Sequence, residues 1–171
     1  MIRVAILTVS DAVAAGERED GGGPALAAAC REALPDVRVE ESAVVADDRT
    51  AIAERIRRWS RAGLDLVLAT GGTGVSPRDR TPEAFRDAVD FEIPGLAEKM
   101  RAETGAAFPA AYLSREVAGV AGATVCLALP GSPRGAVECF RSVAALLPHA
   151  IALVRGERPP HPAPDQPGGA S

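Results

Sequence analysis

The segment LVLATGGTGVSPRDRTPE, residues 66 to 83, joins the pattern of a buried strand to that of a helix through a glycine-rich loop. The run from Leu66 to Ala69 is apolar and of strand type. Directly after it lies a loop, which we call the glycine loop, that contains Gly71, Gly72, Thr73 and Gly74. Because glycine has no side chain, backbone N–H groups of such a loop can approach anionic oxygens closely. The loop indicates a phosphate site, although a simple turn between a strand and a helix uses similar residues.

The second half of the segment supplies a carboxylate and a helix start. Asp79 lies between two arginines. Thr81 is placed to cap a helix that would have Pro82 at its first position and Glu83 in its first turn. A carboxylate beside phosphate-binding N–H groups can hold Mg²⁺. The alternative is a solvated charge cluster in front of a helix, which is common.

Strand patterns alternate with helix patterns along the rest of the chain. Strands are predicted at residues 2–9, 37–45, 66–70 and 124–129, and helices from residue 24, at 50–62, 82–89 and 94–104, and after residue 133. A polar loop is predicted from residue 10 to 23, and its last part, residues 20 to 23, could close over a ligand or be a simple mobile connection. Pro148 should kink or split the last helix, and Gly156 marks its end. The alternation predicts an α/β fold, a three-layer α/β/α sandwich with a mostly parallel sheet.

Every loop with candidate functional residues follows one of these strands. In chain order the loops contain Ser10 and Asp11, then Asp47 and Asp48, then the glycine loop and Asp79, and finally Pro130, Gly131 and Ser132. Ligands of such folds bind at the carboxyl ends of the strands, so topology alone would gather these residues at one edge. Each loop also has a structural interpretation. Aspartate after a strand is a common turn or cap residue, and the Gly131–Ser132 turn is either an anion site before a helix or a tight connection.

Length and composition restrict the class of protein. The chain has 171 residues, which suits one domain over residues 1–156 followed by a proline-rich tail at 157–171 that we expect to be disordered. A net charge of −4 argues against a broad nucleic-acid surface. Three cysteines without a C-x-x-C pair fit free thiols in a reducing cytoplasm. No apolar run reaches the length of a membrane span, and the amino terminus has no signal-peptide pattern.

Six motifs occur in a fixed order: TVSD (8–11), GGTG (71–74), PRDRTPE (77–83), PG (94–95), LSR (113–115) and LPGSP (129–133). Together they strongly resemble the MoaB/Mog family, in particular the molybdopterin adenylyltransferases of molybdenum-cofactor synthesis. The resemblance covers residues 2 to 156. It implies an α/β sandwich, usually a homotrimer, and Mg²⁺-dependent transfer of AMP from ATP to molybdopterin with release of pyrophosphate. The product would pass to a downstream molybdenum-insertion enzyme.

The resemblance also assigns roles to individual residues. It makes Asp47 and Asp79 catalytic and metal-binding. The family usually has Pro-Asp-Glu where this chain has Ala46-Asp47-Asp48, so Asp48 remains an alternative to Asp47 as the first ligand. The residues expected to contact the two substrates are Ser10, Asp11, Gly71, Gly72, Thr73, Gly74, Ser114, Pro130, Gly131 and Ser132.

Two other functions compete with the enzyme. A non-catalytic MoaB-like trimeric scaffold would bind molybdopterin or nucleotide without turnover, and such a relative could lack one of the two aspartates. A general phosphate-binding domain unrelated to molybdenum would fail to bind the pterin.

Overall fold

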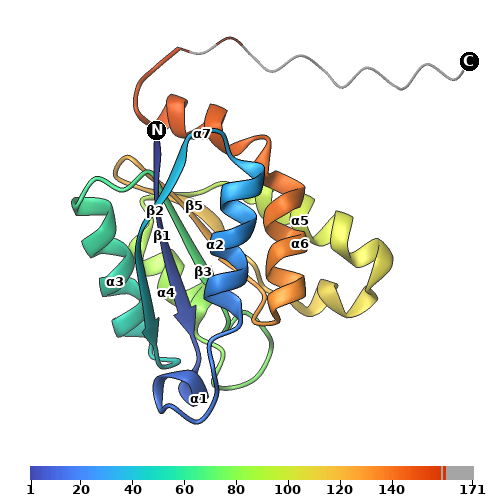
Figure 1. Ribbon diagram of the computed structural model, residues 1–171. Helices are drawn as coiled ribbons and strands as arrows, with labels where there is room; N and C mark the ends of the chain where they lie inside the picture. The colour runs from blue at the N-terminus through green and yellow to red at the C-terminus, as the bar shows by residue number, and fades with distance from the viewer. Residues whose placement is uncertain (159, 161–171) are drawn as a thin grey trace, which may run out of the picture.

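The computed structural model describes residues 1–158 and 160, which form a six-stranded sheet between two layers of helices (Figure 1). The strands follow the order β2-β1-β3-β6-β5-β4 across the sheet. Their bounds are β1 Ile2–Val9, β2 Val37–Val45, β3 Leu66–Thr70, β4 Phe91–Glu92, β5 Ala118–Ala121 and β6 Thr124–Leu129. The first four strands in this order are parallel, which confirms the predicted three-layer sandwich with a mostly parallel sheet.

The antiparallel edge of the sheet was not predicted. β5 pairs with β6 and β4 pairs with β5, both in antiparallel orientation. β5 is only four residues long and consists of alanine, glycine and valine, so it lacks the long branched run by which the other strands are recognised. β4 has two residues, both exposed.

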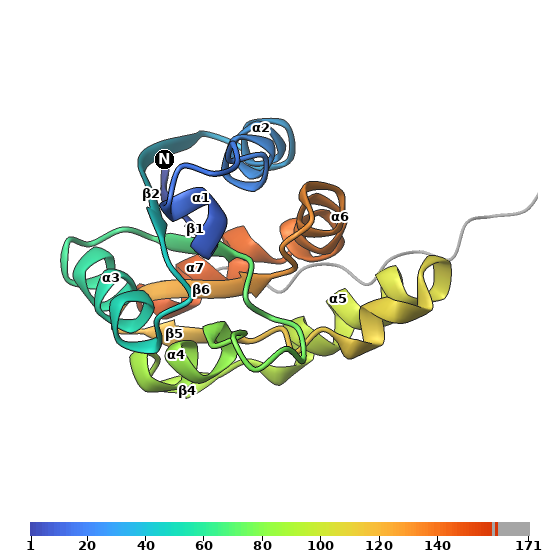
Figure 2. The same cartoon turned by 90° about the horizontal axis from the view of Figure 1, so that it is seen from below.

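Helices cover both faces of the sheet, as Figure 2 shows from the end of the strands. One layer contains α2, α5, α6 and α7, and the other contains α3 and α4. The helical segments are α1 Asp11–Ala14, α2 Gly22–Ala33, α3 Arg49–Arg61, α4 Thr81–Ala88, α5 Pro94–Ala107, the 3₁₀ helix η1 Pro109–Leu113, α6 Pro133–Ala144 and α7 Leu147–Val154.

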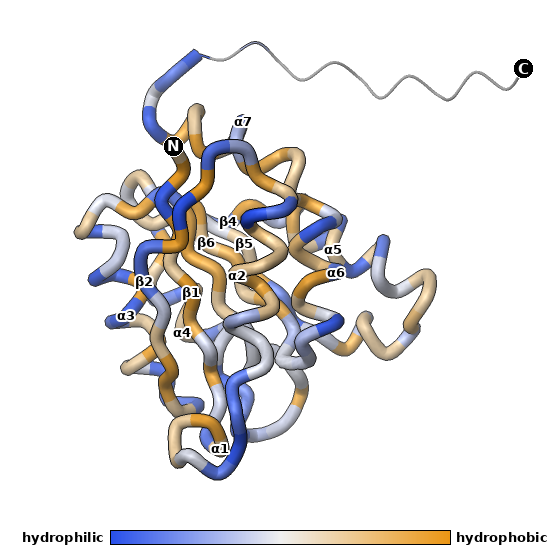
Figure 3. The backbone as a smooth tube through the Cα atoms, viewed as in Figure 1, coloured by the Kyte–Doolittle hydropathy of each residue, from blue (hydrophilic) through white to orange (hydrophobic). Residues whose placement is uncertain are grey.

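The central strands are buried on both faces. In β1, Val4 and Ile6 join the hydrophobic cluster beneath α2 and α6, whereas Ala5 and Leu7 join the cluster beneath α3 and α4. This is why the strand reads as a continuous apolar run rather than an alternating one. Figure 3 shows the same distribution, with hydrophobic colour concentrated along the central strands. The three buried cysteines are free thiols, as predicted, and burial raises the pKa of each to about 12.

Strand register places the loops of interest at one edge. Val9 pairs with Val45, and Thr70 pairs with both Thr8 and Leu129. The carboxyl ends of the four parallel strands therefore lie level with one another, at the end of the sheet where α1 lies in Figure 1.

The starts of three helices differ from the prediction, and the simplest case is α3, which begins at Arg49 instead of residue 50. Thr81 does not cap α4 but is its first residue, and its fully buried hydroxyl donates to the carbonyl of Gly71 at 2.7 Å. The helix expected from Pro24 begins at Gly22, because the Asp20 carboxylate accepts from the N–H of Gly23 at 3.0 Å and satisfies the first turn. The preceding loop also contains the short helix α1.

The carboxyl-terminal helical region is divided as predicted. α6 and α7 meet at 66°, with Pro148 in the first turn of α7. Gly156 has a φ of +79° just after α7, as expected for a helix stop. No single helix among the described residues is long and apolar enough to cross a membrane. Among these residues, only α6 and α7 taken together, as a bent pair, reach that length and apolar composition. The predicted disordered tail falls on residues 157–171, nearly all of which lie outside the described residues.

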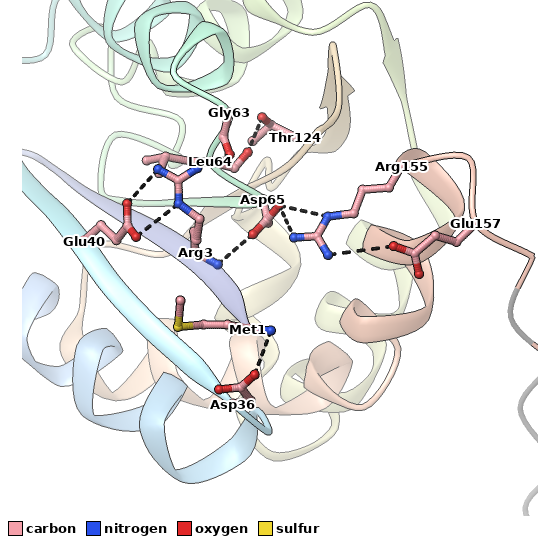
Figure 4. A network of polar contacts seen from close by, with 10 residues as sticks. All are labelled: Met1, Arg3, Asp36, Glu40, Gly63, Leu64, Asp65, Thr124, Arg155 and Glu157. Atoms are coloured by element: carbon pink, nitrogen blue, oxygen red, sulfur yellow. Dashed lines mark hydrogen bonds and ion pairs between the residues drawn. The ribbon is translucent and has the colours of Figure 1, made fainter.

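At the opposite end of the strands, ion pairs fix α7 and the start of the chain (Figure 4). Asp65 is 5% exposed and accepts from the backbone N–H of Arg3 at 2.7 Å and from the Arg155 side chain. The side chain of Arg3 in turn pairs with Glu40. This network closes the end of the sheet that has no candidate site.

Candidate functional site

A cavity of about 630 Å³ opens at the carboxyl ends of the parallel strands. Its walls come from the loops after β1, β2, β3 and β6 and from the start of α2. Seven of the sequence-predicted residues line it: Ser10, Asp47, Gly71, Gly72, Asp79, Gly131 and Ser132. Sheet topology therefore gathers side chains that are up to 122 positions apart between Ser10 and Ser132.

The other predicted residues lie beside this cavity rather than in its wall. Thr73 and Ser114 face each other, with their hydroxyl oxygens 3.0 Å apart, and Ser114 lines a second cavity of about 300 Å³. The carbonyl of Pro130 accepts from the hydroxyl of Thr70 at 2.6 Å, which ties the ends of β3 and β6 together. Asp11 is hydrogen-bonded to Asp47, and Gly74 lies next to the carboxylate of Asp79.

Asp47 and Asp11 are held together by two hydrogen bonds, in each of which the backbone N–H of one residue donates to the carboxylate of the other. The N–H of Asp11 donates to Oδ2 of Asp47 at 3.1 Å, and the N–H of Asp47 donates to Oδ1 of Asp11 at 3.0 Å. Partial burial raises the pKa of Asp47, and the neighbouring carboxylates of Asp11 and Asp79 raise it further. The site therefore disfavours the charged form of Asp47 and would favour a bound cation.

Asp11 is neutralised by Arg78. The guanidinium makes two hydrogen bonds through Nη2 and one through Nε, between 2.7 and 3.0 Å, to the Asp11 carboxylate. These bonds lower the pKa of Asp11. The side chain of Asp11 thus links α1 to the loop after the glycine loop and is committed to protein partners.

Asp79 is oriented by its own loop. Its Oδ2 accepts from the N–H of Ser76 at 2.7 Å. A Cβ on Gly74 would lie 2.8 Å from the same oxygen, so only glycine leaves the carboxylate in this position without a shift. Arg115 supports the loop from behind, because its side chain donates to the carbonyls of Gly74 at 2.8 Å and Asp79 at 3.0 Å and pairs with Glu83.

The structure distinguishes the two adjacent aspartates. Asp48 is the N-cap of α3, and its Oδ1 accepts from the N–H of Ala51 at 2.7 Å. Asp47 lines the cavity, whereas Asp48 is not part of its wall. Helix capping therefore occupies the second carboxylate and leaves the first one directed at the site.

The glycine loop is shaped by close backbone approaches. Gly71 has a φ of +104°, and a Cβ there would lie 2.1 Å from the carbonyl oxygen of Val9. Gly72 has a φ of +64°, and a Cβ would lie 2.7 Å from Oδ1 of Asp47. Both positions need glycine for conformation and for space. The phosphate site at this loop stays a prediction.

The turn before α6 is a short connection with a helix cap, and the anion site at this turn stays a prediction. The hydroxyl of Ser132 accepts from the N–H of Gly135 at 3.1 Å and caps the helix. Gly131, Ser132 and Pro133 also line the cavity. The amino-terminal ends of α6 and α2 therefore both face this space, which favours an anionic ligand there.

A family model described as "Probable molybdopterin binding domain" matches residues 5–149 of the chain. The chain belongs to this family.

The chain is similar in sequence to proteins whose names place them in molybdopterin or molybdenum-cofactor synthesis, and one of them also has a similar solved structure. The molybdopterin biosynthesis enzyme MoaB of Thermus thermophilus is 49% identical, with a TM-score of 0.85 over 92% of this chain and 98% of that one. The molybdopterin adenylyltransferase of Helicobacter pylori J99 is 34% identical over 91% of this chain and 89% of its own length. The molybdenum cofactor synthesis protein cinnamon of Drosophila melanogaster is 38% identical over 90% of this chain, which spans about a quarter (26%) of that protein.

The sequence singled out the end of the loop before α2 as a segment that could close over a ligand, but no residue of that loop was predicted as a site residue. Arg18, Glu19 and Asp20 line the cavity, and Oδ2 of Asp20 accepts from the hydroxyl of Thr8 at 2.7 Å. A signal was present, because Asp20 stands three positions before Gly23 in the spacing of a helix cap.

The two carboxylates fit a magnesium ion whose remaining ligands are oxygens of the substrate and of water. Within the described residues there is no group of three or more histidine, cysteine or acidic side chains placed to hold a metal. Asp47 and Asp79 both face the cavity, and each has one carboxylate oxygen held by a backbone N–H. Mg²⁺ is typically bound by one or two carboxylates together with phosphates and water.

Proposed function

We propose that this chain is a molybdopterin adenylyltransferase, which transfers AMP from ATP to molybdopterin in molybdenum-cofactor biosynthesis. The observation that carries the proposal is the placement of Asp47 and Asp79 on one cavity together with the glycine loop and two helix amino termini. The relatives that have this activity in their names support it, because one of them aligns with nearly the whole ordered chain. The activity of the longer relatives as whole proteins is not carried over.

In the proposed reaction, an oxygen of the terminal phosphate of molybdopterin attacks the α-phosphorus of ATP. A new P–O–P bond forms, the bond to the bridging oxygen of the β-phosphate breaks, and pyrophosphate leaves with that electron pair. The attacking phosphate is already ionised at neutral pH, so no side chain has to remove a proton. Catalysis is then mainly alignment and neutralisation of two anions.

The residues of the cavity divide this work. Asp47 and Asp79 would hold Mg²⁺, which neutralises phosphate charge and stabilises the leaving pyrophosphate. The N–H groups of Gly72 and of the Gly131–Ser132 turn would donate to phosphate oxygens, whereas that of Gly71 already donates to the carbonyl of Leu129 at 3.1 Å. Ser10, at the end of β1, would contribute a hydroxyl to the same space.

Ser114 and Thr73 lie on the side of the glycine loop that faces the second cavity. A reaction between two large substrates needs two adjoining binding regions. We assign the contact of Ser114 to molybdopterin, and Thr73 together with Gly74 connects that region to the cavity with the aspartates.

We also propose a homotrimer, located in the cytoplasm, that passes its product to a downstream molybdenum-insertion enzyme. An exposed apolar surface on η1 and its approach, formed by Phe108, Tyr112 and Leu113, supports the assembly. These three side chains are 60 to 65% exposed in the single chain, which makes them candidates for burial between copies.

The decisive test is the Asp79→Asn variant in an assay with molybdopterin, Mg²⁺ and α-labelled ATP. The amide keeps the shape of the side chain but removes the charge, so we expect folding and molybdopterin binding to persist and label transfer to fall at least 100-fold. Transfer at the wild-type rate would refute the role of Asp79. A wild-type protein that binds molybdopterin tightly without transferring AMP would instead be the non-catalytic scaffold.

A further inference from the structure

The charged side chains in the wall of the main cavity are unbalanced. Glu19, Asp20, Asp47 and Asp79 are acidic, and Arg18 is the one basic residue among the described residues that line the cavity. Any phosphate ligand would enter a space with several carboxylates. A cationic side chain in that wall would offset part of this repulsion.

Arg18 lies in the loop between α1 and α2 and reaches back to the end of β1. Its Nη2 donates to the hydroxyl of Ser10 at 3.1 Å, and the same hydroxyl accepts from the N–H of Val13 at 3.3 Å. Ser10 follows the strand between β2, which leads to Asp47, and β3, which leads to the glycine loop. The guanidinium is thus bonded to a residue at the middle of the site.

The partner of Arg18 is neutral, in contrast to the partners of the arginines nearby. Arg78 is bound to the Asp11 carboxylate, and Arg115 is paired with Glu83. Those two positive charges are already compensated within the protein. The charge of Arg18 has no such compensation from Ser10, although its guanidinium has the planar donor arrangement that suits a phosphate group.

We propose that Arg18 binds a phosphate group of the substrate in the main cavity. The inference rests on the proposed adenylyl transfer for the identity of the substrate but not for the existence of the phosphate site. Two sources have this chemistry, the triphosphate of ATP and the terminal phosphate of molybdopterin. Arg18 is a binding residue that compensates the negative charge of the ligand, and its hydrogen bond to Ser10 sets its position.

The test compares Arg18→Gln with Arg18→Lys and with the control Arg38→Gln. Arg38 is exposed at the amino-terminal end of β2. Its substitution therefore removes the same charge at the end of the strands that is away from the cavity. Binding of ATP, inorganic pyrophosphate and molybdopterin is measured by calorimetry with Mg²⁺ present, at low and high salt. Urea unfolding checks that each variant remains folded.

We expect Arg18→Gln to weaken binding of the relevant ligand roughly tenfold or more, because a charge-assisted hydrogen bond is lost. Its affinity should also depend less on salt than that of the wild type. Arg18→Lys should recover part of the loss, and Arg38→Gln should bind as the wild type does. A loss for ATP and pyrophosphate identifies the nucleotide as the source, and a loss confined to molybdopterin identifies the pterin phosphate.

Unchanged affinity of Arg18→Gln for all three ligands would overturn the inference, as would an equal loss in Arg38→Gln or failure of the wild type to bind any of them. If the wild-type protein binds ATP but transfers no AMP, the proposed activity fails while the phosphate site is still judged by the binding data. The two failures are therefore distinguishable.

Discussion

At the scale of single residues, the site depends on three glycines that have no Cβ, as well as on the side chains that face the cavity. Gly71, Gly72 and Gly74 each stand where a Cβ would come within 3 Å of another atom, and two of those atoms are carboxylate oxygens of Asp47 and Asp79. The glycines therefore set the positions of both aspartates. The first role of the glycines is to leave space for neighbouring atoms, and the supply of N–H donors is a second role.

The Gly71→Ala variant tests this steric role. Because the new Cβ would meet the Val9 carbonyl at 2.1 Å at a φ of +104°, we expect a loss of about 3 kcal/mol in the free energy of unfolding. Urea unfolding measures it. Gly95→Ala, in α5 with nothing within 4 Å of the added Cβ, should be neutral or slightly stabilising. Equal stability of the two variants would contradict the steric role.

A second residue-scale prediction concerns Glu116, whose side chain is fully buried behind Ser114. One carboxylate oxygen contacts Sγ of Cys139 at 3.3 Å, and the other has no hydrogen bond and lies 3.6 Å from Arg101. Burial raises its pKa, despite the opposing effects of the Cys139 contact and Arg101. A raised native pKa means that Glu116 costs stability once it is ionised.

The sign of the pH effect follows from linkage. The contribution of Glu116 is most favourable below its unfolded pKa and is lost as the pH rises through the raised native value. We therefore expect the stability of wild type minus that of Glu116→Gln to fall from about pH 4 to about pH 8 in urea unfolding. Glu98→Gln, an exposed site on α5, controls for the loss of one charge. A difference that rises with pH would show that Arg101 outweighs burial.

At the scale of elements, helix caps decide which carboxylates remain available to a ligand. Asp48 and Ser132 satisfy the first turns of α3 and α6, and Asp20 does so for α2. Asp47, one residue from a cap, is left facing the cavity. The short connections between strand and helix thus place capping residues and candidate ligand residues side by side.

The Asp48→Ala and Asp47→Asn variants should separate these two roles. Loss of the cap in Asp48→Ala should cost about 1 kcal/mol of stability and leave adenylyl transfer near the wild-type rate. Asp47→Asn should retain stability, because the charged form of Asp47 is already disfavoured by burial and by its acidic neighbours. It should lose transfer, because the amide removes the carboxylate charge that would hold Mg²⁺. Thermal unfolding and the label-transfer assay measure the two effects. The reverse pattern would identify Asp48 as the ligand residue.

At the scale of the whole molecule, the hydrophobic core and the candidate site are built from different parts of each strand. The strand interiors supply two hydrophobic clusters, and the strand ends supply the cavity. The surface formed by Phe108, Tyr112 and Leu113 belongs to neither and lies on η1 and the residue before it, beyond the end of α5.

The proposed homotrimer can be tested on this surface. If copies bury Phe108 against one another, Phe108→Asp should convert a particle of about three times 17.6 kDa into a monomer, because a charge would be placed in an apolar contact. Light scattering coupled to gel filtration measures the mass. Leu153→Asp, at an apolar side chain of α7 that is 50% exposed, should leave the mass unchanged. A wild-type monomer would refute the trimer itself.

The amino-acid sequence was enough to predict the four parallel strands and the layered fold, and it predicted a site at the carboxyl ends of those strands, where the structure has a cavity. Long branched runs and the rule that ligands bind at strand ends are local and topological signals, and both can be read without coordinates. The six ordered motifs likewise predicted the family to which the chain belongs. The short β5 was missed because its stability comes from pairing with β6, which a local pattern does not report.

Which residues share a surface could be learned from the three-dimensional arrangement alone. It directed Asp47 at the cavity and Asp48 at a helix, placed Ser114 opposite Thr73, and brought Arg18 into the wall through its bond to Ser10. Each of these outcomes depends on competition among hydrogen-bond donors and acceptors from segments distant in the chain. Sequence spacing contains the candidates for that competition, but the arrangement of the backbone in space selects among them.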